Sequence, residues 1–230
     1  MKPSATSATK NLKPSAPRSH SRLKLLQLLN EHYPDAHCEL SYNNPFELLV
    51  ATVLSAQCTD VMVNKATPAL FAAYPTAEKM SRVSVEQIEK HIKSLGLYRN
   101  KAKNLLSLAQ DLVTHYQGQV PTDLNSLVTL AGVGRKTANV VLGNAFGITS
   151  GIVVDTHVTR LSERFGWTLS EKPEQIEKDL RAFVPREHWI QISHELIFHG
   201  RRVCKARAPD CASCFLLEHC PRIGLTPLDD

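Results

Sequence analysis

A glycine turn followed by an apolar helical pattern constrains this chain more than any other feature. The turn is Gly132-Val133-Gly134, and residues 137–142 after it keep apolar side chains at helical spacing. Glycine adopts backbone angles that other residues avoid and lets a ligand approach the main chain closely. The free N–H groups and the dipole at the start of the following helix favour an anion such as phosphate. The stretch therefore predicts two helices joined by a phosphate-binding turn.

A basic pair, Arg135-Lys136, opens the second of these helices and Thr137 follows it. The ammonium of Lys136 would face the positive end of the helix dipole and the charge of Arg135, and both favour the neutral, nucleophilic amine. Taken alone, the glycines are typical of a turn between core helices with a surface lysine. The whole pattern resembles a helix-hairpin-helix DNA-binding element with Ala131 in place of the usual proline. We therefore expect DNA contacts from Gly132, Gly134, Arg135 and Thr137.

The charge is distributed unevenly along the chain. The net charge is +5, but five cations and no acidic residue lie within the first 22 residues. The other 22 basic residues equal the 22 acidic ones, so any nucleic-acid surface on the folded part must come from local clustering. One such cluster of four cations is Arg201, Arg202, Lys205 and Arg207.

Residues 1–20 are rich in Ser, Pro, Ala and Lys and have no apolar periodicity. We expect a disordered basic tail that adds weak, salt-sensitive affinity for polyanions. A mitochondrial transit peptide is the alternative, but Pro3, Pro14 and Pro17 argue against the amphipathic helix of such leaders. No apolar run approaches the ~20 residues of a membrane span. We therefore expect no membrane partner and, in a bacterium, a cytoplasmic, nucleoid-associated protein.

From residue 21 onward the apolar residues recur at helical spacing without a convincing strand, which predicts an all-α fold. Residues 45–54 are apolar on nearly every face and should form a central, buried helix. Ser84 and Gln87 form a capping-box pattern for a helix that Gly96 would close. Further helices are expected at 21–33, from 59 or 60, at 101–116, from 122 or 123, after the glycine turn, and at roughly 156–166, 172–184 and 187–199, with an irregular stretch at 147–154.

Four of the six cysteines crowd into 17 residues near the end of the chain: Cys204, Cys211, Cys214 and Cys220. Four thiolates on so short a loop can enclose one zinc ion or one iron–sulfur cluster. Structural zinc sites more often contain two close pairs, whereas this loop contains one, so the spacing favours [4Fe-4S]. A disulfide framework is not expected without a secretory signal. Cys38 and Cys58 lie in apolar helical surroundings and are interpreted as small core residues.

Two cations, Lys205 and Arg207, lie in the long first interval of the cysteine loop. A metal centre that fixes the shape of this loop would present them to phosphates rather than take part in the chemistry. We therefore expect both residues to bind DNA. For Arg202, a solvated basic face is the simpler interpretation.

The glycine hairpin, the downstream Val154-Asp155-Thr156-His157 and the four-cysteine loop occur in one order and spacing. In this combination the chain resembles the endonuclease III family of base excision DNA glycosylases with associated lyase activity. The likeness extends over essentially everything after the tail as far as Pro221.

The resemblance implies an all-α fold of two helical lobes with a DNA cleft between them. Residues 39–149 would form a six-helix barrel that carries the helix-hairpin-helix motif at about 124–143. Residues 21–38 and residues 150–230 would together form the lobe that holds the iron–sulfur cluster, so the chain would leave this lobe and return to it.

Lys136 matches the catalytic lysine of this family and Asp155 matches its essential aspartate. An amine at C1′ can displace a damaged base and hold the sugar as a Schiff base, which makes the 2′ proton removable and the 3′ phosphate expellable. Taken alone, Asp155 is typical of a helix N-cap. The resemblance adds that its carboxylate assists proton transfer and stabilises charge at C1′. His157 would orient this aspartate or serve only as a buried, hydrogen-bonded side chain.

Two turns match family loops that turn a nucleotide out of the duplex and fill the gap. Gln57 would face the orphaned base, and Leu97 would wedge into the base stack. Without the resemblance, Gln57 would be interpreted as a polar helix-end residue and Leu97 as a minor core contact.

The resemblance therefore implies a monomeric base excision repair enzyme that acts on double-stranded DNA containing damaged bases or abasic sites. Its substrates would be oxidised or ring-saturated pyrimidines, with strand cleavage 3′ to the abasic sugar by β-elimination. One alternative is a monofunctional adenine glycosylase of the same superfamily, but such enzymes lack a lysine at the position of Lys136. The other alternative is a non-catalytic iron–sulfur DNA-binding protein.

Overall fold

The structure is a computed structural model that describes residues 19–226 of the chain. The expected basic tail at residues 1–20 lies almost entirely outside the described residues. Within the described range every regular element is a helix, which confirms the predicted all-α class. In chain order the helices are α1 (Ser19–His32), α2 (Pro45–Leu54), α3 (Asp60–Ala73), α4 (Ala77–Ser81), α5 (Val85–Ile92), α6 (Tyr98–Tyr116), α7 (Leu124–Leu127), α8 (Arg135–Phe146), α9 (Thr156–Arg164), α10 (Pro173–Arg181), the 3₁₀ turn η1 (Arg186–His188) and α11 (Trp189–Arg202).

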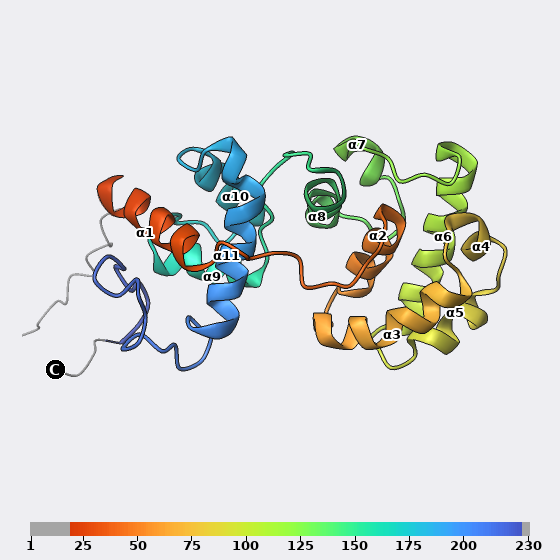
Figure 1. Cartoon of the computed structure of the whole chain (residues 1–230), viewed down its shortest axis with the longest axis horizontal. Coiled ribbons are helices and arrows are strands. Elements are labelled where there is room, and N and C mark those ends of the chain that lie inside the picture. Colours follow the sequence, from red (N-terminus) through yellow and green to blue (C-terminus); the bar gives the residue numbers. More distant parts are fainter. Residues whose placement is uncertain (1–18, 227–230) are drawn as a thin grey trace, which may run out of the picture.

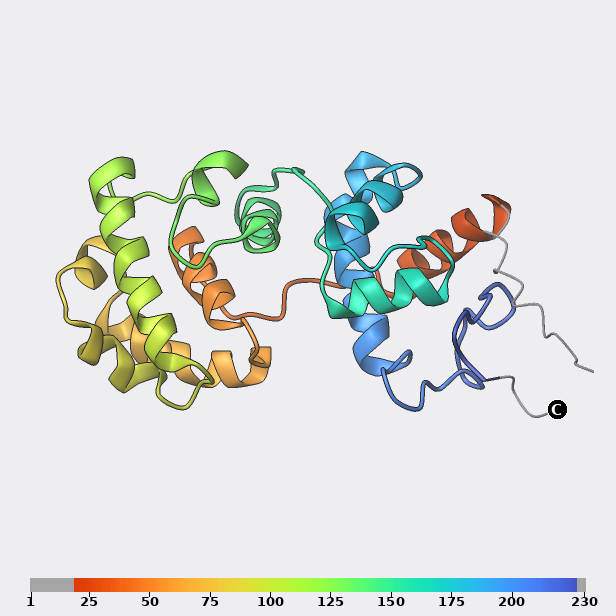
Figure 2. The same cartoon turned by 180° about the vertical axis from the view of Figure 1, so that it is seen from behind.

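The helices form two lobes, each around its own apolar core (Figure 1). The barrel lobe contains α2 to α8, and its buried core runs from Leu40 to Leu142. The cysteine lobe contains α9, α10, α11 and the cysteine loop, residues 204–220, and α1 packs against it through Leu25 and Leu29. The chain therefore leaves the cysteine lobe after α1 and returns to it after α8, as Figure 2 shows from behind.

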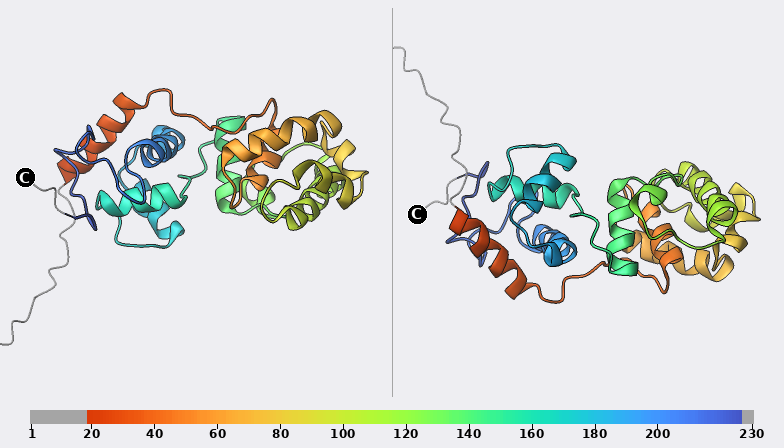
Figure 3. Two further views of the ribbon diagram at one scale, coloured as in Figure 1. Left: turned by 90° about the horizontal axis from the view of Figure 1, so that it is seen from below. Right: turned by 90° about the horizontal axis from the view of Figure 1, so that it is seen from above.

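Two extended segments connect the lobes. Residues 33–44 lead from α1 to α2, and residues 147–155 lead from α8 to α9. Views from below and above show both crossing the space between the lobes (Figure 3). The irregular stretch predicted at 147–154 is confirmed, although Ile152, Val153 and Val154 within it are buried.

Helix α2 is the central buried helix that its composition predicts. Every residue from Phe46 to Leu54 is buried, and the helix packs against α3, α6 and α8. Asn44 caps it, because its side chain accepts a hydrogen bond from the backbone of Glu47, and Pro45 occupies the first turn, where no amide donor is needed. This helix fixes the position of α8 and therefore of the glycine hairpin.

The connection from α5 to α6 differs from the sequence-based expectation. The capping box of Ser84 and Gln87 is present, but α5 ends at Ile92 and Gly96 does not take the left-handed conformation. Leu97 takes it instead, with φ of 57°, and α6 begins directly after it rather than at residue 101. The glycine signal therefore pointed to the right turn but to the wrong residue within it.

Helix α11 runs to Arg202, three residues beyond the expected end. Its last turn places Arg201 at the boundary between the lobes. There it forms ion pairs with Glu39, in the 33–44 segment, and with Asp60, the first residue of α3. Long-range ion pairs of this kind leave no local signal in the sequence.

Candidate active site

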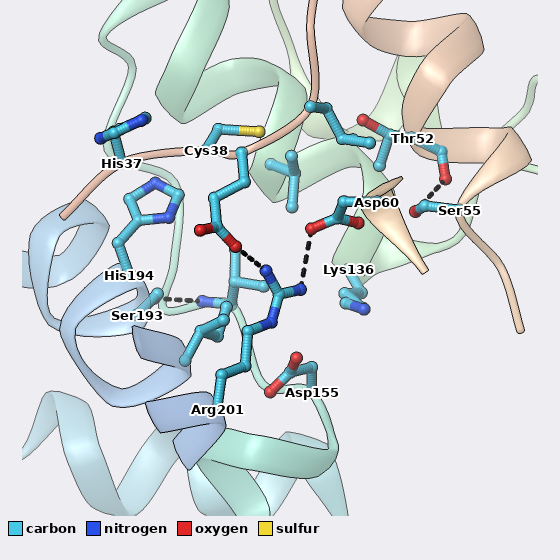
Figure 4. A pocket seen from close by; sticks show the side chains of 15 residues that line it. His37, Cys38, Thr52, Ser55, Asp60, Lys136, Asp155, Ser193, His194 and Arg201 are labelled. Carbon is cyan, nitrogen blue, oxygen red and sulfur yellow. Dashed lines mark hydrogen bonds and ion pairs between the residues drawn. The ribbon is translucent and has the colours of Figure 1, made fainter. Parts of the chain in front are cut away.

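A pocket between the two lobes brings Lys136 and Asp155 together (Figure 4). The barrel lobe contributes side chains from α2, α3 and α8, and the cysteine lobe contributes α11 and the end of the 147–155 segment. In the close view both side chains point into the same space. No ion pair or hydrogen bond joins the two side chains, so the space between them is open to a substrate.

The glycine hairpin joins α7 to α8, and its two glycines differ in their surroundings. Gly132 has φ of +77°, and a Cβ there would lie 3.0 Å from Nδ2 of Asn104 and 3.3 Å from Cγ1 of Val53. Gly134 has an ordinary φ of −94°, and a Cβ there would meet nothing within 4 Å. Gly132 is thus required by the fold, whereas nothing within the described protein requires glycine at position 134.

The first turn of α8 is open to solvent. Gly134 is its N-cap and provides no side-chain cap, and the first backbone bond is donated by Ala138 to the carbonyl of Gly134. The N–H groups of Arg135, Lys136 and Thr137 therefore remain free to bind an anion. Lys136 is exposed in this same turn.

Arg135 is engaged in an ion pair across the lobe boundary. Its Nε lies 3.0 Å from Oε2 of Glu177 on α10, and its Nη2 lies 3.2 Å from Oε1 of the same carboxylate. The side chain of Glu177 is nearly buried. This carboxylate compensates the charge of Arg135 beside Lys136. The ion pair of Arg135 with Glu177 also joins the two lobes.

Asp155 is the N-cap of α9, as its sequence context predicts. Its Oδ1 accepts hydrogen bonds from the backbone amides of His157 (2.8 Å) and Val158 (2.9 Å). Its Oδ2 has no hydrogen bond to a described residue and is free to act in the pocket. The imidazole of His157 contacts Arg160 through Nδ1 at 3.2 Å and not the carboxylate, so the simpler of the two interpretations of His157 holds.

Arg201 forms the strongest ion-pair network of the pocket, and the sequence analysis did not assign it to the site. Its guanidinium donates to Glu39 in the linker and, at 2.8 Å, to Oδ2 of Asp60 at the start of α3. All three residues line the pocket with Lys136 (Figure 4). Arg202 also pairs with Glu39, at 3.9 Å, and lies over the ring of Phe198. Half of the expected basic cluster is therefore neutralised by acids.

His194 on α11 is a second pocket residue that sequence reasoning missed. Its Nε2 lies 2.9 Å from Oδ1 of Asn144 on α8, so this contact also crosses the lobe boundary. Burial, with a smaller contribution from nearby His37, lowers the pKa of His194 to about 4. A histidine within an apolar helix gives no local signal for such a partner 50 residues away.

Gln57 and Leu97 lie in neighbouring loops and share an unusual backbone. Both are exposed, Leu97 to 57%, and both have left-handed φ angles, of 56° and 57°. Such angles are uncommon for residues other than glycine and cost of order 1 kcal/mol each. A Cβ added to Gly96 would lie 3.8 Å from Sγ of Cys58, so the two loops lie side by side. An exposed leucine on a strained turn suits a side chain that enters another molecule.

The four cysteines of the loop surround one small cavity beside α9 and α11: Cys204, Cys211, Cys214 and Cys220. Burial raises the pKa of Cys214, and raises that of Cys220 to about 11, and the other cysteines add to both shifts. Within residues 19–226, no three His, Cys, Asp or Glu side chains converge as ligands of a single metal ion. A cluster does not need that convergence, because each thiolate binds a different iron. The donor set and the shared cavity therefore fit an iron–sulfur cluster.

Donors from α9 and α11 reach the cysteine loop from the lobe core. Arg164, which is buried, donates to Sγ of Cys204 at 3.1 Å and to the carbonyls of Lys205 (2.8 Å) and Ala206 (3.1 Å). His199 has its Nε2 3.6 Å from Sγ of Cys214. Such contacts around metal ligands orient the ligands and tune the bound group.

The backbone that Arg164 holds presents Lys205 and Arg207 to solvent. Both side chains are exposed and neither forms an ion pair within the described part of the chain. They are the unpaired half of the basic cluster, and they lie on the opposite lobe from the glycine hairpin. Free cations of this kind can bind phosphate without first losing an acidic partner.

Comparison with known proteins gives one consistent result. The model of the HhH-GPD superfamily of base excision DNA repair proteins matches residues 50–186. Endonuclease III of Synechocystis sp. is 48% identical over 210 residues, which are 91% of this chain and 96% of that protein. Endonuclease III of Bacillus subtilis is 49% identical over 198 residues, 85% of this chain and 89% of its own length.

The fold agrees with that of a solved complex. The structure of a trapped endonuclease III–DNA covalent intermediate with an estranged adenine superposes with a TM-score of 0.85 at 47% identity. The match covers 89% of this chain and 97% of that one. The likeness therefore includes both lobes and the pocket between them. No helix in the described part of the chain is long and apolar enough to span a membrane.

Proposed function

The chain belongs to the endonuclease III family, within the HhH-GPD superfamily of base excision DNA repair proteins, and from this premise we propose how it works as a bifunctional DNA glycosylase and abasic-site lyase. Its substrate is double-stranded DNA, and the bases removed are oxidised or ring-saturated pyrimidines. The observation that carries the proposal is the common pocket of Lys136 and Asp155, which belong to different lobes. An amine and a carboxylate that face one space are the groups that a glycosylase and lyase needs.

Lys136 acts as the nucleophile. Its amine attacks C1′ of the damaged nucleotide, the C1′–base bond breaks, and loss of the ring-oxygen bond leaves a Schiff base between Nζ and the opened sugar. The iminium acidifies the 2′ proton, whose removal expels the 3′ phosphate. The free amides at the start of α8 bind a backbone phosphate and so bring C1′ to the lysine of the same turn.

Asp155 supports the reaction from the facing lobe. Its Oδ1 is used in capping α9, which fixes the rotamer and leaves Oδ2 without a hydrogen-bond partner among the described residues, on a side chain that lines the pocket. This oxygen takes the proton of the lysine and stabilises the positive charge that develops at C1′. The cap is therefore the device that positions the catalytic carboxylate.

The target nucleotide is turned out of the duplex to reach this pocket. Gln57 fills the gap opposite the orphaned base and Leu97 enters the stack, both from turns whose backbone is held in the left-handed region. Gly132 and Gly134 allow the phosphate backbone to approach α8, where Thr137 follows the lysine in the first turn. Lys205 and Arg207 bind phosphates at the other lobe, so one protein monomer grips the strand on both sides of the lesion.

We assign the [4Fe-4S] cluster that the family carries to Cys204, Cys211, Cys214 and Cys220. When bound, it supplies four iron–sulfur bonds that fix the shape of a loop without regular structure. The chain's own residues then complete the loop: Arg164 holds the carbonyls beside the first cysteine, and the loop in turn holds Lys205 and Arg207 toward DNA.

Single-turnover cleavage of duplexes tests this function. One duplex carries a single ring-saturated thymine, the second an abasic site, and the third no lesion. We expect base release and cleavage 3′ to the lesion from the first, cleavage from the second and no reaction with the third. In Lys136→Gln we expect both activities to fall by about 10⁴-fold, while binding to the abasic duplex stays within about threefold of the wild type. Cleavage by this variant at the wild-type rate would refute the proposal.

A further inference from the structure

A buried lysine beneath the two loops has a cysteine as its partner. Lys101, in the first turn of α6, is only 4% exposed, and its Nζ donates to Sγ of Cys58 at 3.1 Å. No other described residue offers Nζ a side-chain or carbonyl hydrogen bond. A buried ammonium without a partner is costly, so the sulfur is important for Lys101. The interpretation of Cys58 as a small core residue is therefore incomplete.

Cys58 also lies at the surface of the protein. It is half-buried and lines a surface pocket with Thr59, Asp60 and Arg201. A small oxidant can enter this pocket beside Cys58. Oxidation of the thiol to a sulfenic acid makes its sulfur electrophilic, and Nζ of Lys101 is already in contact with that sulfur.

The other cysteine outside the cysteine loop provides an internal comparison. Cys38 is half-buried and also lines a pocket, but no lysine contacts its sulfur. Burial raises the pKa of Cys38, so it stays a thiol. The two cysteines thus have similar exposure and differ in the cation.

We propose that Cys58 and Lys101 are a modification site for hydrogen peroxide, at which oxidation joins the two side chains by a reversible sulfur–nitrogen bond. In the first step the thiol is oxidised to a sulfenic acid and the peroxide is reduced to water. In the second step the ammonium of Lys101 releases one proton to solvent, the resulting amine attacks the sulfur, the S–O bond breaks, and water leaves. A low-molecular-weight thiol then reduces the S–N bond and restores both side chains.

The position of this bond gives it a consequence for DNA binding, and this consequence rests on the proposed function. Cys58 follows Gln57 in the chain, and its sulfur lies next to Gly96, which precedes Leu97. The present contact is 3.1 Å, so a covalent S–N bond requires the α2–α3 loop to move toward α6. Both side chains that are proposed to enter the duplex would shift with it.

Peptide mapping of the cluster-loaded protein tests the chemistry without DNA. The protein is treated with hydrogen peroxide at a dose that leaves the visible absorbance of the cluster unchanged, then alkylated and digested. We expect a cross-linked peptide that joins the segments of Cys58 and Lys101, 2 Da lighter than their sum, and its loss after dithiothreitol. Cys38 should remain reduced. Lys101→Met should give no cross-link.

Binding to an abasic-site duplex tests the consequence. We expect peroxide to weaken binding by the wild type by about tenfold, equivalent to 1.4 kcal/mol, and dithiothreitol to restore it. Cys58→Ser, whose hydroxyl can still accept a hydrogen bond from Lys101, should bind as the untreated wild type does, with or without peroxide. Absence of the cross-linked peptide in the wild type, or equal oxidation of Cys38 and Cys58, would overturn the proposal. Neither result would affect the proposed repair activity, which is measured on reduced protein.

Discussion

The two lobes of this molecule are both helical and each has an apolar core, but the segments that carry their functional residues are held in place differently. In the barrel lobe a continuous apolar core fixes every helix, and the hairpin rests on that core through Gly132. In the cysteine lobe the segment 204–220 has no helix, and polar bonds from Arg164 and the four cysteines define its course. Packing therefore positions Lys136, the proposed nucleophile, whereas polar bonds and the proposed cluster position the cations of the loop.

The pocket depends on how the two lobes meet, and three polar contacts set that register. They are the ion pair of Arg135 with Glu177, the pairing of Arg201 with Glu39 and Asp60, and the hydrogen bond of His194 to Asn144. A single substitution can remove each of these contacts, whereas the barrel core consists of many apolar residues that pack together. The comparison predicts that substitutions in the barrel lobe act through packing and those at the boundary act through geometry or charge.

The largest effect on catalysis from the cysteine lobe should come from Asp155. In Asp155→Asn the amide oxygen can still cap α9, so we expect the free energy of unfolding to change by less than about 0.5 kcal/mol. The charge in the pocket is lost, and kcat should fall by about 10²- to 10³-fold. Denaturant unfolding and single-turnover kinetics give the two quantities.

Asp155→Ala is the matched variant, because it removes both the cap and the charge. It should lose a further ~1 kcal/mol of stability with a similar loss of rate. Full activity in either variant would remove Asp155 from the mechanism.

The next largest effect should come from the cysteine loop. We expect Cys211→Ala to release the cluster, to lower the stability of the cysteine lobe by several kcal/mol, and to weaken DNA binding by at least about tenfold. The barrel lobe should keep its helices, because its core does not involve the loop. Thermal melts by circular dichroism and binding to an abasic duplex measure both effects.

Cys38→Ala is the control for the loop, since Cys38 lies outside the cavity of the four cysteines. It should retain the cluster and the affinity. Loss of the barrel helices together with the cluster would show that the two lobes do not differ in the way described.

The two glycines of the hairpin should separate folding from binding. Gly132→Ala forces a left-handed φ on alanine against Asn104 and Val53, so we expect a loss of about 1–3 kcal/mol of stability. Gly134→Ala should cost about 0.5 kcal/mol or less, since its φ is ordinary and its surroundings are empty. Its affinity for duplex DNA should nevertheless fall, because a methyl group would meet the phosphate. Unchanged affinity in Gly134→Ala would contradict phosphate binding at this turn.

An effect on stability alone should be a pH dependence from His194. Its pKa is lowered to about 4 by burial, so the native state stays neutral while the unfolded state takes up a proton near pH 6.5. Stability from this group is therefore lost as pH falls from 6.5 toward 4. The neighbouring Glu195 acts oppositely, since burial raises its pKa to about 7 and its contribution is lost as pH rises from 4.5 to 7.

The difference between wild type and His194→Gln isolates the histidine. We expect the free energies of unfolding in urea to converge by up to about 2 kcal/mol as pH falls from 7 to 5. A constant difference across this range would mean that His194 ionises normally in the native protein.

The sequence predicted well whatever depends on residues that are close together in the chain. The capping box at Ser84, the N-cap at Asp155 and the glycine hairpin are all interactions within four residues, and the structure contains each of them. The resemblance to a known family supplied the two-lobed, all-α fold, which is confirmed. The catalytic and DNA-binding roles stay predictions for the experiments above.

Interactions between distant segments escaped the sequence analysis. Arg201 was grouped with a basic surface, but its partners Glu39 and Asp60 are 162 and 141 residues away. Arg135 was assigned to DNA and to an effect on Lys136, whereas its partner Glu177 lies 42 residues further along. The left-handed turn was assigned to Gly96, because propensity favours glycine there, but Leu97 adopts it.

The most direct test of the account is to identify the residue that becomes covalently bound to DNA. The wild type is incubated with an abasic-site duplex in the presence of borohydride, and the reduced adduct is digested and mapped by mass spectrometry. The account predicts a single modified peptide with the sugar on Nζ of Lys136, and no adduct in Lys136→Gln. An adduct on another lysine, or one that persists in Lys136→Gln, would contradict it.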